Sequence, residues 1–240
     1  MHNSAFRALR MDWTYELLDI APEKLTATVA GLRAADVAGA NVTIPYKQAV
    51  MQSVESIDDE AMRARAVNTI VNQDGRLSGY NTDIAAIRYA LEEVGVDANG
   101  ANAIILGAGG AARAAAQALR GAHLVFVARR PDDADVPGKT VGWDDPGVAS
   151  MTRSADVLIN ATPLGRREEM PLRPAALPKE GAVIDLVYVA GGTPLVRKAR
   201  SIGLRTVDGW SVLLRQGAIA FELWTGKSAP LDAMRETLTP

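Results

Sequence analysis

The sequence predicts an α/β protein with a parallel sheet, because strand signals alternate with helix signals. Apolar runs of strand length recur in the second part of the chain, at residues 103–106, 124–127, 155–160, 182–187 and 204–207. Helical patterns at 110–119 and 194–202 lie between such runs. Strands and helices that alternate in this way form a parallel sheet with helices on both faces.

A glycine-rich turn joins the first of these strands to the helix after it. Gly107 is placed for the tight turn, and Gly109 lets a phosphate approach the backbone. Ala112 takes the third position of the G-x-G-x-x-G/A pattern, where a small residue lets helix and strand pack. Free N–H groups at the helix start would hold a pyrophosphate. We therefore predict a Rossmann-like domain with a dinucleotide site at Gly107, Ala108, Gly109, Gly110 and Ala111.

The end of the next strand favours NADP over NAD. NAD-binding proteins usually place Asp or Glu about 20 residues after the glycines, to bond the ribose 2′-hydroxyl. This chain has Arg129 and Arg130 there. A guanidinium suits a 2′-phosphate by charge and by bidentate geometry. Asp132 and Asp133 follow closely and could instead pair with these arginines on a solvated loop, which keeps NAD as the minority alternative.

The first part of the chain predicts a separate αβ domain. We expect strands at 13–20, 39–44, 66–71 and 76–81, and helices at 4–10, 22–32 and 82–94, with another helix starting near Tyr46 and Lys47. Asp74 and Gly75 give a hairpin signal. The acidic run 55–60 predicts a helix start capped by Ser56 or Asp58. A final helix at 210–224 is free to cross back to this domain.

Composition excludes several classes of function. The 240 residues are 48% hydrophobic and 22% charged, with a formal net charge of -2, which is ordinary for a globular protein and indicates no nucleic-acid or membrane surface. Without cysteine there is no disulfide, thiolate nucleophile or Cys-based metal site, and two histidines, His2 and His123, make no zinc site. With no signal peptide or apolar membrane span, a cytoplasmic location is the default.

Two polar clusters outside the glycine turn are candidates for chemistry, at 41–47 and at 79–83. Lys47 and Asp83 fall at strand-to-helix junctions, where two such side chains can meet in a cleft. A lysine there could take a hydroxyl proton while hydride leaves the same carbon for a nicotinamide. From the residues alone, Lys47 as a solvated helix residue and Asp83 as an N-cap remain the simpler interpretation. For Thr43 and Asn68 a structural role is likewise the simpler interpretation, because polar residues are common in turns and at strand ends.

A series of motifs resembles the shikimate dehydrogenase family over nearly the whole chain. They fall in the family's order: N-V-T-I-P-x-K at 41–47, A-V-N-T at 66–69, G-x-N-T-D at 79–83, G-A-G-G-A at 107–111, N-A-T-P-L-G at 160–165, D-L-V-Y at 185–188 and W-T-G at 224–226. Each motif alone is weak, but the ordered series is highly specific.

The resemblance implies a role for each matching residue. Lys47 would be the acid/base and Asp83 its partner at the substrate. The substrate's hydroxyls or ring would be bound by Thr43, Asn68, Tyr188 and Gln216. The pyrophosphate would lie on residues 107–111, with Arg129 at the 2′-phosphate and Arg130 adding charge. The remaining cofactor contacts would be Thr162, Leu186 and Gly209.

The implied reaction is the reversible reduction of 3-dehydroshikimate to shikimate with NADPH, in aromatic amino acid and chorismate biosynthesis. The implied fold has a substrate domain at 1–98 and 211–240 and an NADP-binding domain at 99–210, with the active site between them. Shikimate and 3-dehydroshikimate are the expected small-molecule partners, and a homodimer is left open.

Two features depart from the family pattern. Ala128 and Arg130 replace the Asn before and the Ser or Thr after the family's arginine. The family's first strand and Ser-x-Ser segment, which holds the substrate carboxylate, have no match before His2 and Asn3. Either the start is misassigned or truncated, or the chain is naturally short and catalytically weak. We expect unpaired backbone, an open core and weak shikimate binding; a Michaelis constant of about 1 μM to 1 mM would contradict the last.

Two alternatives stay open. The chain could be a non-catalytic NADP-binding module, which the absent carboxylate anchor favours and which the set Lys47, Asp83 and Gln216 argues against. Among enzymes, a quinate or aminoshikimate dehydrogenase is the nearest rival, because no visible pocket residue decides the substrate.

Overall fold

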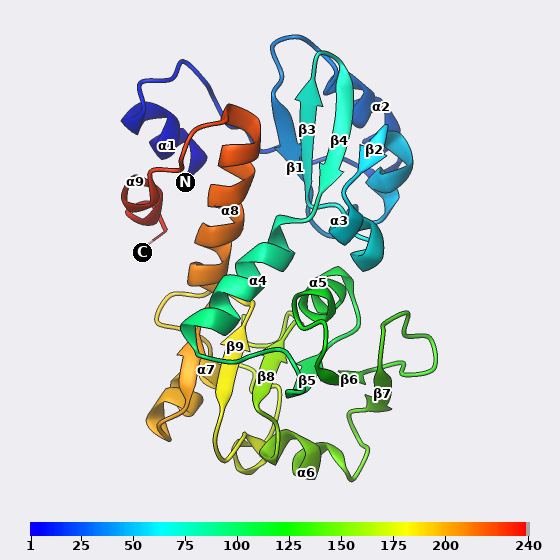
Figure 1. The fold of residues 1–240 in the computed structure, drawn as a ribbon, viewed down its shortest axis with the longest axis vertical. Coiled ribbons are helices and arrows are strands. Elements are labelled where there is room, and N and C mark those ends of the chain that lie inside the picture. The colour runs from blue at the N-terminus through cyan, green and yellow to red at the C-terminus, as the bar shows by residue number, and fades with distance from the viewer. Residues whose placement is uncertain (239–240) are drawn as a thin grey trace. The chain divides into compact units, whose positions relative to one another are not determined.

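The computed structural model describes residues 1–238, which divide into two compact units (Figure 1). Unit one combines Met1–Thr82 with the chain from Leu214 onward. Unit two is Asp83–Leu213. The chain thus leaves unit one within helix α4 (Thr82–Glu93) and returns to it within helix α8 (Gly209–Thr225).

Unit one contains a four-stranded mixed sheet in the order β1-β3-β4-β2. Its strands are β1 (Gly39–Asn41), β2 (Ser56–Ile57), β3 (Thr69–Gln73) and β4 (Arg76–Tyr80). β3 and β4 are antiparallel, and their turn has φ of 52° at Asp74 and 84° at Gly75. A turn with positive φ at both central residues matches the twist of the two strands, so the hairpin prediction is confirmed.

Unit one also contains short helices. They are α1 (His2–Ala8), η1 (Pro22–Lys24), α2 (Leu25–Gly31), η2 (Ala49–Ser53), α3 (Asp59–Ala64) and α9 (Leu231–Arg235). The carboxylate of Asp58 accepts the N–H groups of Glu60 at 2.7 Å and Ala61 at 2.9 Å. Asp58 is therefore the cap of α3, and Ser56 instead lies in β2.

The predicted strand at 13–20 is wrong. This segment forms neither a helix nor a strand, and Leu17 is 91% exposed. The Asn3 side chain holds the backbone of Tyr15, accepting its N–H at 2.7 Å and donating to its carbonyl at 3.0 Å. Partial alternation of apolar residues indicated a strand, but a strand also needs a neighbour to pair with. The predicted helix start at Tyr46 and Lys47 is likewise a turn, before η2.

Unit two contains a six-stranded parallel sheet in the order β10-β9-β8-β5-β6-β7. Its strands are β5 (Asn102–Leu106), β6 (His123–Ala128), β7 (Lys139–Gly142), β8 (Val157–Asn160), β9 (Ala182–Asp185) and β10 (Arg205–Val207). The sequence interpretation missed β7, which has charged and polar residues and lies at the sheet edge. The other five strands were predicted, and the Rossmann-like fold class is confirmed.

Helices connect these strands as an α/β fold requires. They are α5 (Gly110–Ala118), α6 (Val148–Arg153), η3 (Pro174–Ala176) and α7 (Pro194–Ser201). Ala112 of α5 is fully buried, as the pattern at the glycine turn predicts. Apolar strand residues such as Leu106, Val127 and Leu158 form the core together with residues of α7.

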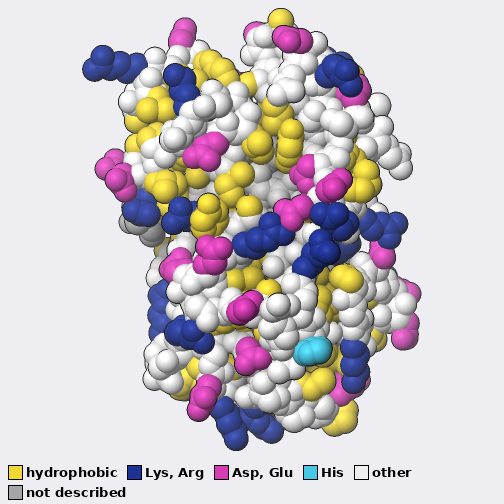
Figure 2. Space-filling model, viewed as in Figure 1, with side chains coloured by type: hydrophobic (Ala, Val, Ile, Leu, Met, Phe, Trp, Pro, Cys, Tyr) yellow, Lys and Arg dark blue, Asp and Glu magenta, His cyan; other side chains and the backbone are white. Residues whose placement is uncertain are grey.

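The C-terminal helix belongs to unit one over most of its length, which confirms the predicted return. Phe221 of α8 packs on Phe6 of α1, with ring centroids 5.4 Å apart. The indole of Trp224 donates to the carbonyl of Ile70 in β3 at 2.9 Å. None of the helices in residues 1–238 has the length and hydropathy that a membrane span requires. Basic and acidic side chains are interspersed on the face that Figure 2 shows.

Candidate active site

The glycine turn has the geometry that a bound phosphate needs. Gly107 has φ of +103°, a conformation that only glycine adopts without strain, and a Cβ there would lie 3.0 Å from the carbonyl oxygen of Ala161. At Gly109 a Cβ would meet no atom within 4 Å, so the space above this residue is open. The turn therefore combines a constrained first glycine with an accessible second one.

The first N–H groups of α5 have no acceptor within the helix itself. Gly109 is the N-cap and offers no side chain to cap the helix. The first intrahelical bond runs from the N–H of Arg113 to the carbonyl of Gly109 at 3.0 Å. The N–H groups of Gly110, Ala111 and Ala112 come before it and need an outside acceptor. A phosphate at this nine-residue helix would supply oxygens in a favourable field.

The other predicted cofactor residues of unit two follow neighbouring strands at the same edge of the sheet. Thr162 follows β8, Leu186 follows β9, and Arg129 follows β6. Because the strands are parallel, their carboxyl ends meet at one edge, which is where α/β proteins bind ligands. The structure thus places Thr162, Leu186, Arg129 and the glycine turn at this edge of one sheet.

A buried carboxylate connects two of these loops. Asp185, with no exposed surface, accepts hydrogen bonds from the Thr193 hydroxyl at 2.6 Å, the Asn160 amide at 2.9 Å and the Val187 N–H at 3.0 Å. Asn160 in turn accepts the hydroxyl of Thr162 at 2.7 Å. Burial raises the pKa of Asp185 to about 6, against these hydrogen bonds. The network holds the loops that carry Thr162 and Leu186.

The sequence interpretation assigned no role to Asn160, Asp185 or Thr193. The sequence did contain a signal for Asn160 and Asp185, because each is a polar residue at the end of a largely apolar strand. Polar residues at the carboxyl ends of parallel strands are candidates for a ligand site. Thr193 gave no signal, since it acts as the N-cap of α7 and its bond to Asp185 depends on the fold.

Gly209 and Tyr188 lie together at the start of α8. A Cβ at Gly209 would lie 2.4 Å from the carbonyl carbon of Val187 and 2.7 Å from the nitrogen of Tyr188. Tyr188 is 43% exposed, and its ring packs on the Trp210 indole, with centroids 5.2 Å apart. Trp210 donates to the carbonyl of Val189 at 3.0 Å and so holds this loop against α8.

The two predicted arginines have different surroundings. Arg129, Pro131, Trp143 and Asp144 help to line a surface depression of about 530 Å³ at the carboxyl ends of β6 and β7. Arg130 forms an ion pair with Asp133, with 3.9 Å between its Nε and Oδ2 of Asp133, and both side chains are largely exposed. Of the two, Arg129 therefore has the position that suits a 2′-phosphate, while Arg130 matches the solvated-loop alternative.

In unit one, the predicted substrate residues Asn68 and Gln216 meet around Thr82. The Oδ1 atom of Asn68 accepts the backbone N–H of Thr82 at 2.7 Å, and its Nδ2 donates to the hydroxyl of Thr82 at 3.0 Å. The same hydroxyl lies 3.5 Å from Oε1 of Gln216 on α8. Asn68 and Thr82 are both buried.

Lys47 and Thr43 lie in the loop between β1 and η2, and Asp83 is the second residue of α4. The half-buried Lys47 is tied to the strand region by its carbonyl, which accepts the N–H of Val67 at 2.8 Å. Thr43 is exposed. Asp83 directly follows Thr82, whose N–H is bonded to Asn68. The assignment of Lys47 and Asp83 as a catalytic pair stays a prediction.

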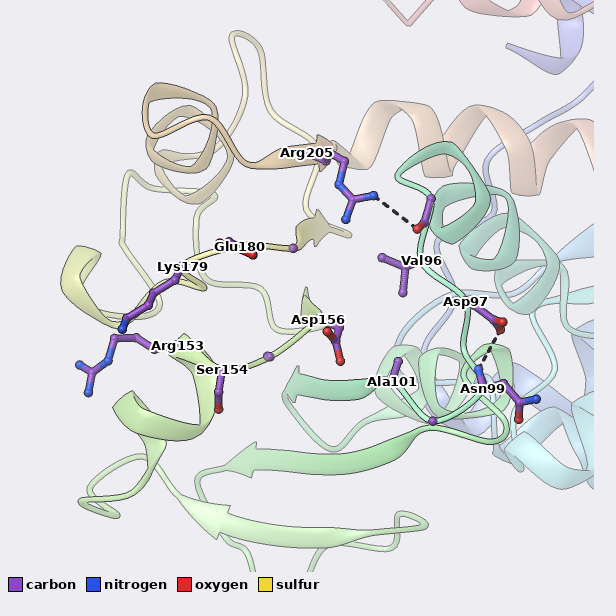
Figure 3. Close-up of a pocket in the computed structure, with 14 residues that line it drawn as sticks. Val96, Asp97, Asn99, Ala101, Arg153, Ser154, Asp156, Lys179, Glu180 and Arg205 are labelled. Carbon is purple, nitrogen blue, oxygen red and sulfur yellow. Dashed lines mark hydrogen bonds between the residues drawn. The ribbon is translucent and has the colours of Figure 1, made fainter.

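A second depression, of about 740 Å³, lies at the opposite edge of the unit-two sheet (Figure 3). It is formed at the amino ends of β5, β8, β9 and β10. Its charged lining is balanced, with Arg153, Lys179 and Arg205 against Asp97, Asp156 and Glu180. The Arg205 guanidinium donates to the carbonyls of Val94 and Gly95 at the end of α4. This depression contains none of the predicted site residues.

Known proteins resemble this chain over almost its whole length. Residues 1–70 match the model of the shikimate dehydrogenase substrate binding domain, and residues 209–239 match that of the shikimate 5'-dehydrogenase C-terminal domain. A shikimate dehydrogenase (NADP(+)) from Moorella thermoacetica is 43% identical, over 99% of this chain and 86% of the relative. This chain belongs to the shikimate dehydrogenase family. The resemblance drawn from the motifs is confirmed.

Solved structures of the family agree with the fold described above. Shikimate 5-dehydrogenase from Thermus thermophilus, in complex with NADP(H) and shikimate, has a TM-score of 0.88 at 36% identity, covering 99% of this chain and 91% of that one. The ligand-free 5-ketofructose reductase of a Gluconobacter strain has a TM-score of 0.84 at 30% identity, covering 98% and 90%. The second name shows that this fold also occurs in a reductase named for another substrate.

Proposed function

We propose that this protein catalyses the reversible, NADP-dependent reduction of 3-dehydroshikimate to shikimate. The observation that carries the proposal is the ordered set of family motifs on a chain that is 43% identical to a shikimate dehydrogenase (NADP(+)) along 99% of its length. The polar residues at the end of the strands support it, because they provide both a phosphate-binding turn and buried amides for a polyhydroxylated ring.

The residues at the carboxyl edge of the unit-two sheet fit NADP. The open space at Gly109 and the N–H groups that begin α5 suit a pyrophosphate, and Arg129 in its depression suits a 2′-phosphate. Thr162, Leu186 and Gly209 would line the rest of the cofactor. When bound as NADPH, the cofactor supplies the hydride that reduces the substrate's carbonyl carbon.

The protein's own residues handle the proton and the position of the ring. The Lys47 ammonium gives a proton to the carbonyl oxygen, which becomes a hydroxyl, and the neutral amine takes it back in the oxidation direction. The Asp83 carboxylate holds the lysine and the neighbouring hydroxyl in place. Asn68, Thr43, Tyr188 and Gln216 bind the remaining oxygens of the ring and so orient the carbonyl.

Replacing Lys47 with Ala tests this proposal against a non-catalytic NADP-binding module. An acid/base residue contributes about 10²- to 10⁴-fold to rate, so kcat should fall by that factor while the Kd for NADPH changes less than about twofold. The matched control is Lys24→Ala, which removes an exposed lysine from η1 of the same unit and should keep wild-type kcat. Unchanged turnover in the Lys47 variant would exclude Lys47 as the acid/base. If the wild-type protein did not turn over shikimate, the proposed shikimate dehydrogenase activity would be excluded.

Comparing kcat/KM for shikimate and quinate, each with NADP⁺ and NAD⁺, tests the substrate and cofactor. We expect shikimate with NADP⁺ to be preferred. Three further expectations remain predictions: the functional domains at 1–98 with 211–240 and at 99–210, the cytoplasmic location, and a homodimer. Chromatography coupled to light scattering tests whether the protein is a homodimer.

A further inference from the structure

The loops after β5, β6 and β7 begin side by side at one edge of the unit-two sheet (Figure 1). Ala128 at the end of β6 pairs with Gly142 at the end of β7, so Arg129 and Trp143 leave their strands at the same level. The glycine turn follows β5, the other neighbour of β6. Adjacent strands lie about 4.8 Å apart, which puts roughly 10 Å between the turn after β5 and the loop after β7. One bound molecule can span that distance.

The chemical order of NADP matches the spatial order of these loops. In the cofactor, the pyrophosphate joins the nicotinamide ribose to a second ribose, which carries the 2′-phosphate and the adenine. In the sheet, β5 lies between β8 on one side and β6, followed by β7, on the other. With the pyrophosphate at the glycine turn and the 2′-phosphate at Arg129, the base continues away from β5 and toward the loop after β7.

Trp143 gives this loop a flat apolar surface that is held in place by the protein. Its half-buried side chain packs against the core of unit two and also helps to line the depression beside Arg129. A ring that the core already orders loses little conformational entropy when a ligand binds. Nucleobases stack on aromatic side chains through their flat faces. The indole therefore suits a base better than it suits a phosphate or a sugar.

Asp144 and Asp145 both line the depression, but their carboxylates have different positions. Oδ1 of Asp145 accepts the N–H of Gly147 at 2.7 Å in the turn before α6. The exposed Asp144 folds back over the end of β7, because a Cβ on Gly142 would lie 2.6 Å from its Oδ1. An ionised carboxylate can only accept hydrogen bonds, so it suits an amino group and repels a phosphate.

We propose that the depression at the carboxyl ends of β6 and β7 is the adenine subsite of the cofactor, in which the Trp143 indole stacks on the base and the Asp144 carboxylate accepts a hydrogen bond from its 6-amino group. This inference rests on the proposed function, in which NADP is the cofactor. It adds that the protein selects the base as well as the 2′-phosphate. Hypoxanthine has an oxygen in place of the 6-amino group, so it would meet the carboxylate with a second acceptor.

Calorimetric titration of the full chain with adenosine 2′,5′-bisphosphate tests the indole without any turnover. Trp143→Ala should raise the Kd for this probe about tenfold, the effect of one base–aromatic stack, and the Kd for NADP⁺ by the same factor. Trp143→Phe keeps an aromatic ring and should stay within about threefold of wild type. The matched control is Met151→Ala, which removes another partly buried side chain packed on the same core but outside the depression. It should leave both Kd values unchanged.

Nicotinamide hypoxanthine dinucleotide phosphate tests the carboxylate. Wild-type protein should bind this analogue about three- to tenfold more weakly than NADP⁺, the effect of one hydrogen bond. Asp144→Asn should remove or reverse that preference, because an amide can also donate to the 6-oxygen, and a merely structural role would not change the preference. The matched control is Asp133→Asn, which removes an exposed carboxylate from the loop after β6, outside the depression. It should keep the wild-type preference.

Equal Kd values for wild type and Trp143→Ala would overturn the stacking role. Equal binding of the two dinucleotides by wild-type protein would overturn the recognition of the amino group. Wild-type protein that binds neither NADP⁺ nor the bisphosphate would overturn the proposed cofactor, and the subsite with it. Protein that binds NADP⁺ with the expected preferences but does not turn over shikimate would support the subsite and overturn the proposed reaction.

Discussion

Two buried titratable side chains, Asp185 and His2, have pKa values that burial moves in opposite directions. Burial raises the pKa of Asp185 from 3.8 to about 6, although three donors surround its carboxylate. Burial lowers the pKa of His2 from 6.5 to about 4. The ring of His2 packs between Tyr15 and Trp224, and among the described residues its Nδ1 has no hydrogen-bond partner. Compared with the unfolded chain, the folded protein therefore favours the neutral form of both side chains.

The Asp185→Asn variant should change how stability depends on pH. Between about pH 4 and 6 the folded wild type binds more protons at Asp185 than the unfolded chain does, so this group lowers the free energy of unfolding as pH rises. The full effect is about 3 kcal/mol, the free-energy difference between a pKa of 3.8 and one of about 6. Urea unfolding across this range should show that the asparagine variant has lost this decline. Parallel profiles of wild type and variant would contradict it.

The His2→Gln variant should give the opposite difference. Since the folded state binds fewer protons at His2 between about pH 4 and 6.5, this residue raises the free energy of unfolding as pH increases. The two slopes partly cancel in the wild type, so each is visible only as a difference from its variant. Urea unfolding of the His2 variant should show less loss of stability on acidification to pH 4, and a greater loss would exclude a neutral buried imidazole.

At the scale of the elements, glycines let loops and helices approach each other closely. Gly209 allows α8 to begin against the backbone of Val187, and Gly107 allows the turn after β5 to lie on Ala161. The motif analysis assigned both to the cofactor. The structure adds a packing reason for each, independent of any ligand.

Gly209→Ala should destabilise the protein by about 1–3 kcal/mol, because its Cβ would lie 2.4 Å from the Val187 carbonyl carbon, a backbone atom that cannot move alone. Gly31→Ala is the matched control, since a Cβ at this last residue of α2 meets no atom within 4 Å. Alanine there should be neutral or stabilising by up to about 1 kcal/mol. Urea unfolding measures both, and equal effects of the two substitutions would contradict the packing argument.

At the scale of the whole molecule, the predicted binding residues divide between the two units. The predicted cofactor residues lie in unit two, at the carboxyl ends of its strands, while the predicted substrate-side residues Thr43, Lys47, Asn68 and Gln216 lie in unit one. Asp83 and Tyr188 are the predicted substrate-side residues that unit two provides. Both units are therefore needed for the proposed reaction.

Hydrogen exchange should separate the two ligands. NADP⁺ should protect amides at 107–113, 160–165 and 186–189, because it would cover the loops of one sheet edge. Shikimate should instead protect 41–47 and 66–69 in unit one. Each ligand at 100 times its Kd should add about 2.7 kcal/mol to the stability of the state that binds it. Protection by NADP⁺ at the opposite edge, around residues 95–101 and 179–181, would contradict the proposed cofactor site.

The sequence alone determined the fold class, the glycine turn after β5 and the family. These depend on local patterns: apolar runs for the buried strands β5, β8 and β9, the glycine spacing at 107–112, and a series of short motifs in a set order. The Asp58 cap and the hairpin at Asp74 and Gly75 were also predictable, because a cap or a turn involves residues adjacent in the chain.

Only the tertiary structure decided which residues distant in sequence become hydrogen-bond partners. The Thr69 hydroxyl, the Asn160–Asp185–Thr193 network and the loop at 13–20 each depend on partners distant in sequence. The partner of a polar side chain determines what that side chain does: it can be solvated at the surface, hold two segments together, or orient a neighbouring side chain. That partner is chosen when the chain folds, because packing brings residues such as Asn41 and Thr69 within hydrogen-bond distance.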